Sequence, residues 1–159
     1  MVDIRERIDE GNRRYQADHA PIESARPSAR LAVLTCMDAR IDPLRVLGLH
    51  LGEVHVLRNA GARVTEDMIR SLAISQQALG TDTIVVMPHT GCGVIGLQPD
   101  NIHPRSGSGA EAIELYPIRD LQQSLQDDLA RLRNSPWLRP DTRILGAIFD
   151  IKTGALDWV

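Results

Sequence analysis

Apolar residues along this chain fall into four short runs, and longer segments with helical spacing lie around them. The runs predict β-strands at residues 31–37 and 53–61, within 81–93, and at 143–151. The helical spacing predicts helices over residues 3–18, 42–48, 65–80 and 117–134. Strands that alternate with helices predict an α/β fold of three layers, in which helices flank a central, mainly parallel four-stranded sheet. A short extended segment is expected to end the chain.

The helix predicted at residues 3–18 has a thin apolar stripe formed by Ile4, Ile8 and Tyr15. So narrow a stripe among charges favours a helix that packs only lightly on its own domain, or onto a partner. The Pro- and Ser-containing segment 20–30 is predicted to be a linker, and residues 97–116 a loop. We therefore expect one domain over residues 1–159, with residues 1–30 as an N-terminal helical arm.

Composition and charge exclude several classes of function. With 159 residues, 43% hydrophobic and 25% charged, the chain resembles an ordinary globular domain. A net charge of −3, the lack of a basic run and only 3% aromatic residues argue against nucleic-acid binding. The charged N-terminus has no apolar stretch of signal-peptide length, and no segment approaches the length of a membrane span, so we expect a cytoplasmic protein without a membrane partner. Two cysteines in such a chain favour metal binding or thiol chemistry over a disulfide framework.

The segment LTCMDARID at 34–42 places Cys36, Asp38 and Arg40 at alternate positions after an apolar run. In an extended chain these three side chains leave the same face. They would lie at the carboxyl end of the first strand, where ligands bind in parallel sheets. A salt bridge at the entry of the next helix is the structural alternative for the acid and the base.

The segment HTGCG supplies His89 and Cys92 at the end of the third strand. With Cys36 they offer two thiolates and one imidazole, a set that suits a tetrahedral Zn²⁺ ion. Three protein ligands with an open fourth position are typical of catalytic zinc. The fourth ligand is water or Asp38, because none of the other histidines lies at a spacing typical of a fourth metal ligand. These are His19, His50, His55 and His103.

Charge counting gives Asp38 and Arg40 a functional role. Two thiolates cancel the charge of Zn²⁺, so such a site acidifies its water less than three neutral imidazoles do. A carboxylate that Arg40 keeps ionised and oriented could accept a hydrogen bond from a zinc-bound hydroxide, or coordinate the metal itself.

These residues resemble the two signatures of the β-class carbonic anhydrases, Cys-x-Asp-x-Arg, here CMDAR, and His-x-x-Cys, here HTGC. Between them, RNAG at 58–61 resembles a turn that supports the zinc site in that family. The resemblance covers residues 30–95 closely and points to the short, compact members. It implies that Cys36, His89 and Cys92 bind zinc and that Asp38 and Arg40 are catalytic. In an inactive arrangement of the family, the aspartate becomes the fourth ligand and releases its arginine.

The resemblance also implies an activity and an assembly. The reaction is reversible hydration of carbon dioxide to bicarbonate and a proton by zinc-bound hydroxide. The assembly is a homodimer, or a dimer of dimers, in which the N-terminal helix lies on the neighbouring subunit. The alternatives are hydrolysis of carbon disulfide or carbonyl sulfide on the same scaffold, a redox-sensing pair of Cys36 and Cys92, and a zinc-binding interaction module closed by Asp38. The four remaining histidines are candidates for the proton shuttle.

Overall fold

The computed structural model of the protein describes residues 3–98, 100, 102–105, 111 and 113–159. Part of the loop predicted at 97–116 therefore lies outside the described residues. The elements of the described chain are, in order, α1 (Ile4–Asp18), β1 (Leu31–Cys36), α2 (Pro43–Leu47), β2 (Val54–Asn59), the 3₁₀ helix η1 (Ala60–Ala62), α3 (Glu66–Gln77), β3 (Thr83–Met87), α4 (Leu121–Arg133), β4 (Arg143–Phe149) and β5 (Leu156–Trp158).

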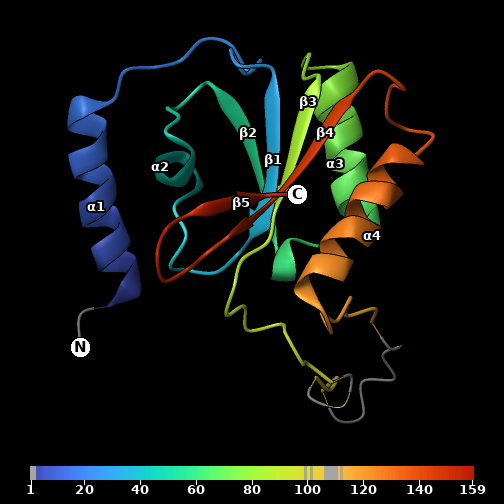
Figure 1. Ribbon diagram of the computed structural model, residues 1–159. Coiled ribbons are helices and arrows are strands. Elements are labelled where there is room, and N and C mark those ends of the chain that lie inside the picture. Colours follow the sequence, from blue (N-terminus) through green and yellow to red (C-terminus); the bar gives the residue numbers. More distant parts are fainter. Residues whose placement is uncertain (1–2, 99, 101, 106–110, 112) are drawn as a thin grey trace.

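The strands form one sheet in the order β2-β1-β3-β4-β5 (Figure 1). β1 pairs in parallel with β2 and β3, and β3 pairs in parallel with β4. The predicted mainly parallel α/β sheet is therefore confirmed. The structure adds a fifth strand, β5, which pairs antiparallel to β4. The expected extended segment at the end of the chain becomes this strand because a turn after β4 reverses the chain. The Gly154 amide donates to the Asp150 carbonyl at 2.8 Å across this turn, and Gly154 has φ +77°.

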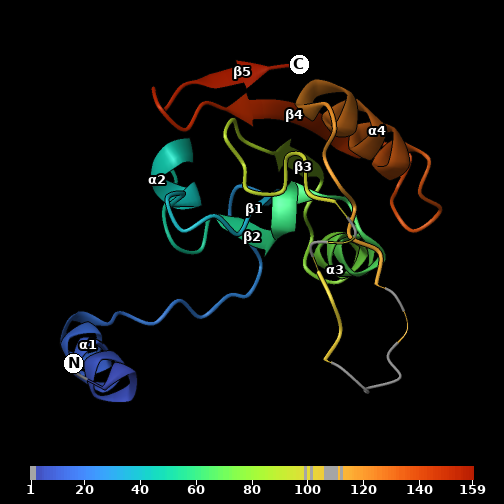
Figure 2. The same cartoon turned by 90° about the horizontal axis from the view of Figure 1, so that it is seen from below.

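Helices cover both faces of the sheet, as three layers require. Figure 2 shows α3 and α4 on one side and α2 on the other. One core cluster joins the sheet to α3 and α4 through Leu34, Leu72 and Leu129. The second cluster lies on the α2 side and includes both Cys36 and Cys92. The candidate ligands are thus part of a packed core and not of a surface loop.

Helix caps explain where the predicted boundaries shift. The Thr65 hydroxyl accepts a hydrogen bond from the Met68 amide, so α3 begins where the sequence predicts. α4 begins at Leu121 and not near Pro117, because the Asp120 carboxylate caps the Gln123 amide at 2.7 Å. Before that cap, residues 119–120 form a bend, and Ile118 forms a β-bridge with Ile95.

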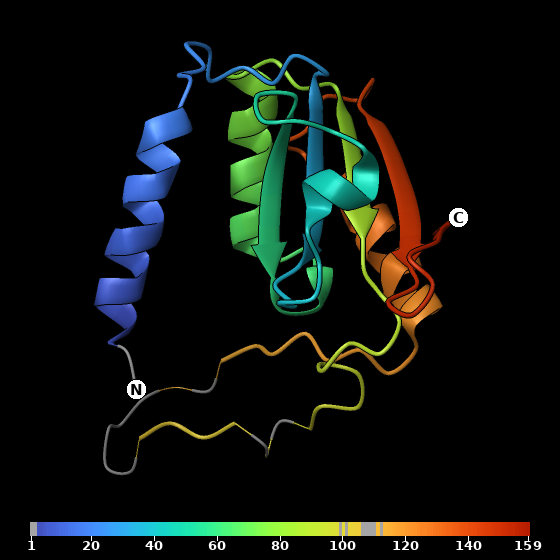
Figure 3. The same cartoon turned by 90° about the vertical axis from the view of Figure 1, so that its left-hand side faces the viewer.

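The N-terminal helix α1 stands away from the sheet (Figures 1 and 3). None of its residues is buried, and Ile4, Ile8 and Tyr15 are 65%, 60% and 54% exposed. Its own domain therefore leaves the apolar stripe uncovered. Among the residues that the structure describes, no helix combines the length and the apolar character needed to cross a membrane.

Candidate metal centre

Cys36, His89 and Cys92 converge at one edge of the sheet. Cys36 is the last residue of β1, and the other two lie in the turn that follows β3. Because β1 and β3 are neighbouring parallel strands, their carboxyl ends meet at the same edge. One ligand atom from each residue lies within 4.8 Å of the other two, and all three residues are buried. The structure thus brings together the three ligands expected from the sequence.

The two sulfur atoms have the separation of thiolates that share a metal ion. Cys36 Sγ and Cys92 Sγ lie 3.7 Å apart, and both thiols are free. A disulfide would require about 2.05 Å. Two zinc–sulfur bonds of about 2.3 Å at a tetrahedral angle place the sulfurs roughly 3.8 Å apart. The sulfur pair therefore fits zinc without rearrangement.

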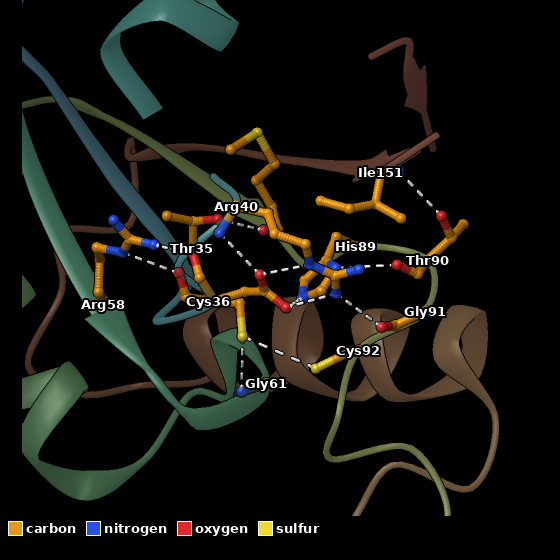
Figure 4. Close-up of polar contacts among 12 residues, drawn as sticks. Thr35, Cys36, Arg40, Arg58, Gly61, His89, Thr90, Gly91, Cys92 and Ile151 are labelled. Atoms are coloured by element: carbon orange, nitrogen blue, oxygen red, sulfur yellow. Dashed lines mark hydrogen bonds and ion pairs between the residues drawn. The ribbon is translucent and has the colours of Figure 1, made fainter. Parts of the chain in front are cut away.

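The His89 side chain is oriented as a metal ligand. Its Nδ1 lies 2.9 Å from the Thr90 carbonyl oxygen, which can only accept, so Nδ1 carries the proton (Figure 4). Nε2 then presents a lone pair. This Nε2 is the one buried side-chain nitrogen or oxygen without a hydrogen-bond partner in the described part of the chain. Buried polar atoms are rarely left unpaired, so the Nε2 lone pair indicates an electrophilic ligand at this point.

The turn after β2 supports the Cys36 side of the site. The Gly61 amide lies 3.4 Å from Cys36 Sγ and donates to it. The Arg58 guanidinium donates to the carbonyl oxygens of Cys36 and Asp38 at 2.9 and 2.7 Å. The RNAG turn therefore holds both the backbone and the sulfur atom of this residue in place.

Burial raises the pKa of the Cys92 thiol above its ordinary value, partly offset by the Val94 backbone amide. Since a metal binds the thiolate, binding must displace the Cys92 proton.

Asp38 and Arg40 form a tight pair beside these three residues. Arg40 Nε and Nη2 donate to the two carboxylate oxygens of Asp38 at 2.8 and 2.7 Å, and Nη2 also donates to the Gly91 carbonyl at 3.1 Å. Hydrogen bonds from Arg40 hold the pKa of the Asp38 carboxyl well below its usual range. Asp38 Oδ2 lies 3.6 Å from His89 Nε2. The carboxylate is therefore ionised and next to the position that a metal would take.

The shared strand face expected for Cys36, Asp38 and Arg40 is wrong. β1 ends at Cys36, and the Asp38 carboxylate accepts the Arg40 backbone amide at 3.0 Å, which turns the chain. The pair reaches the site through this turn. Two backbone partners of the site, the carbonyls of Thr90 and Gly91, could not be found from the sequence, because main-chain acceptors carry no residue signature.

Two of the remaining histidines have other roles in the fold. His55 pairs with Ala32 in the sheet, at the far end of β1 from Cys36, and its ring nitrogens contact the Ser75 hydroxyl and the Ala25 carbonyl. His19 lies next to Tyr15 at the end of the α1 arm. His50 and His103 are exposed. The structure identifies none of the four as a proton shuttle.

Comparison with known proteins places this site in a family context. The family model described as carbonic anhydrase matches residues 31–135. The chain is 42% identical over 140 residues to β-carbonic anhydrase 1 of Mycobacterium tuberculosis, covering 84% of this chain and 83% of that protein. It is 33% identical over 154 residues to a carbon disulfide hydrolase of an Acidianus species, covering 80% and 76%. The crystal structure of a carbonic anhydrase from Streptococcus mutans superposes with a TM-score of 0.86 at 36% identity, covering 100% of this chain and 99% of that one.

Proposed function

This chain belongs to the β-class carbonic anhydrase family, and we propose that it hydrates carbon dioxide reversibly at a zinc ion held by Cys36, His89 and Cys92. The observation that carries the proposal is the unpartnered Nε2 of buried His89, next to two sulfurs 3.7 Å apart. Zinc in such a site supplies Lewis-acid chemistry that makes water nucleophilic near neutral pH.

The protein's own groups control the proton and the geometry of this reaction. Ionised Asp38 accepts a hydrogen bond from the attacking water and so aims its lone pair at the carbon atom of the substrate. Arg40 fixes both carboxylate oxygens and keeps Asp38 charged. With both oxygens engaged by Arg40, and with Asp38 outside the group of mutually close ligand atoms, we assign Asp38 the role of hydrogen-bond acceptor and not that of fourth ligand.

Stopped-flow hydration of carbon dioxide between pH 7 and 9, on protein with its zinc content measured, tests this proposal. We expect activity that requires zinc, and a loss of at least about 100-fold in Asp38→Asn with zinc still bound. Full zinc loading without hydration would favour the closed interaction module. Full activity in Asp38→Asn would refute the role of Asp38.

Two other candidate functions are measured in the same preparation. Carbon disulfide and carbonyl sulfide are offered as substrates, and we expect carbon dioxide to be preferred, because the carbonic anhydrase relative is more similar than the carbon disulfide hydrolase. A redox pair would show a reducible Cys36–Cys92 disulfide and no stoichiometric zinc. The cytoplasmic location predicted from the sequence stays a prediction.

We also propose that the protein is a homodimer in which α1 covers the neighbouring subunit. The exposed stripe of Ile4, Ile8 and Tyr15 supports this, since no side chain of α1 is buried in its own subunit. A groove of about 520 Å³ along α3, which includes Ile74 and Trp137, offers an apolar surface of suitable kind. Exposed apolar grooves are typical of interaction sites.

A further inference from the structure

Arg63 and Asp128 form the most buried arginine–carboxylate pair in the part of the chain that the structure describes. Their side chains are 13% and 5% exposed, and Arg63 Nε donates to Asp128 Oδ2 at 2.7 Å. Arg63 Nη2 donates to Asp128 Oδ1 at 3.4 Å, and Nη1 donates to the carbonyls of Tyr116 and Pro117 at 2.8 and 3.2 Å. One guanidinium therefore joins helix α4, the turn after β2 and the segment that leads into Ile118.

Arg63 closes the turn that supports Cys36. Its backbone amide donates to Asn59 Oδ1 at 2.9 Å, and Asn59 Nδ2 donates to the Arg63 carbonyl at 2.6 Å. Within the turn, Gly61 and Ala62 both adopt left-handed conformations, with φ +78° and +58°. A residue other than glycine holds such a conformation only when its surroundings impose it. This strained turn aims the Gly61 amide at Cys36 Sγ.

The segment bound by Arg63 Nη1 also reaches the chain around Cys92. Ile118, which follows Pro117, is 1% exposed, and its carbonyl accepts the Gly96 amide at 3.0 Å. A β-bridge joins Ile118 to Ile95, three residues after Cys92. On its other side Ile118 lies directly against the turn, because a Cβ built on Gly61 would meet Ile118 Cδ1 at 2.9 Å. The Arg63 contacts therefore extend to the chain segments near both sulfur ligands.

We propose that Arg63, held by Asp128, is a positioning residue for the metal centre. It locks the turn and the Ile118 segment together, so that the Gly61 amide stays on the Cys36 sulfur and the two sulfurs keep their spacing. A buried ion pair is an expensive way to hold a helix against a turn, and apolar side chains would do so equally well. The guanidinium instead adds directed bonds at fixed angles, which apolar contacts and lysine cannot reproduce. This inference rests on the proposed zinc function.

Arg63→Lys tests the inference, with Arg30→Lys as its matched control. Arg30 also pairs with an aspartate at 2.7 Å, but its pair with Asp82 is exposed and lies before β1, at the opposite end of that strand from Cys36. The measurements are the zinc dissociation constant by chelator competition and the exchange rate of the Gly61 amide in metal-free protein. We expect Arg63→Lys to weaken zinc binding about 10-fold, as loss of groups behind metal ligands does, and to accelerate Gly61 exchange. Arg30→Lys should change neither.

A second variant covers the case in which Arg63→Lys does not fold. Asp128→Asn keeps an acceptor oxygen and removes the charge, so we expect a smaller change in the same direction. Leu132→Val in α4 is a control for general destabilisation. Leu132 is buried in the core cluster between the sheet and helices α3 and α4, and its apolar side chain makes no hydrogen bond to the turn. It should lower the unfolding midpoint and leave zinc binding unchanged.

Two outcomes would overturn the inference. One is unchanged zinc affinity and Gly61 exchange in both Arg63→Lys and Asp128→Asn. The other is a loss of zinc affinity in Leu132→Val that equals the loss in Arg63→Lys when the two variants have the same unfolding midpoint. Failure of the wild-type protein to bind zinc would overturn the proposed function instead, and Gly61 exchange in the metal-free protein would still decide whether Arg63 holds the turn.

Discussion

At the scale of single residues, the site depends on atoms whose state is set by one neighbour each. The Thr90 carbonyl fixes the tautomer of His89 and leaves Nε2 free for a metal. The Gly61 amide donates a hydrogen bond to Cys36 Sγ and so fixes the position of the sulfur. Arg40 keeps Asp38 ionised through two side-chain hydrogen bonds. The chemistry of each group therefore follows from its nearest partner, and single substitutions should separate these effects.

Arg40→Gln should move the acidic limb of the pH–activity profile to higher pH. Arg40 holds the pKa of Asp38 far below its ordinary value, so removing the guanidinium lets that pKa rise. Asp38 then becomes protonated, and activity is lost, at a higher pH than in the wild type. The profile of kcat/KM against pH measures the shift. Arg45→Gln, at an exposed arginine of α2, is the control. An unshifted limb in Arg40→Gln would show that Asp38 is not the group that limits activity in acid.

At the scale of elements, the site is made by the ends of β1 and β3 and by the turn after β2. The strands bring the ligands to one edge, and the turns aim them. The turn at 59–63 contains two residues with positive φ, Gly61 and Ala62, and the turn at 88–93 contains one, Gly91. Backbone geometry at these turns is therefore as important as the side chains that they carry.

Gly61→Ala should destabilise the protein more than Gly48→Ala does. Both glycines have positive φ, but a Cβ at Gly48 meets nothing within 4 Å, whereas one at Gly61 lies 2.9 Å from Ile118 Cδ1. We expect Gly48→Ala to lower the free energy of unfolding by about 1–2 kcal/mol. For Gly61→Ala the added overpacking brings the loss to roughly 2–4 kcal/mol.

Denaturant unfolding of the metal-free variants measures both losses. In the double variant Gly61→Ala/Ile118→Val, removal of the Cδ1 methyl should recover part of the Gly61→Ala loss. Equal losses at Gly48 and Gly61, with no recovery in the double variant, would mean that Ile118 does not press on the turn.

At the scale of the whole molecule, a packed α/β domain carries a helix that it does not cover. The sheet and helices α2, α3 and α4 share two core clusters, and α1 contributes to neither. The two cores of the domain therefore form without α1, and the subunit leaves the stripe of α1 exposed. A second subunit would cover this stripe in the homodimer proposed above.

Ile4→Glu/Ile8→Glu should convert the proposed dimer to a monomer, because two charges would enter the apolar stripe. The domain should unfold at an unchanged denaturant concentration when both forms are compared as monomers, since α1 buries no residue in its own subunit. Size-exclusion chromatography with light scattering measures the mass. Arg13→Glu changes the net charge by the same two units on the opposite side of the helix and should leave the dimer intact. A wild-type monomer, or a dimer that survives the double substitution, would contradict the proposed role of α1.

Much of the fold was predictable because buried positions recur along the sequence with the period of the helix or strand that carries them. The continuous apolar run of β1 and the spacing of apolar residues in α3 and α4 located these elements to within a few residues. The late start of α4 was not predictable from periodicity, because the Asp120 cap and the bridge of Ile118 to Ile95 compete with the helix. β5 was expected only as an extended segment, since its pairing depends on how the chain reverses after β4.

The sequence by itself determined which residues are the candidates for the chemistry, namely the two cysteines, His89 and the pair of Asp38 and Arg40, because their types and spacing favour a zinc site. Only the tertiary structure decided how they act together. It placed Asp38 by a turn and not by strand alternation, left His89 Nε2 unpartnered, and connected Arg63 to Asp128 across 65 residues. The physical reason is that these features depend on distances and angles between segments far apart in the chain, and local residue patterns carry no information about either.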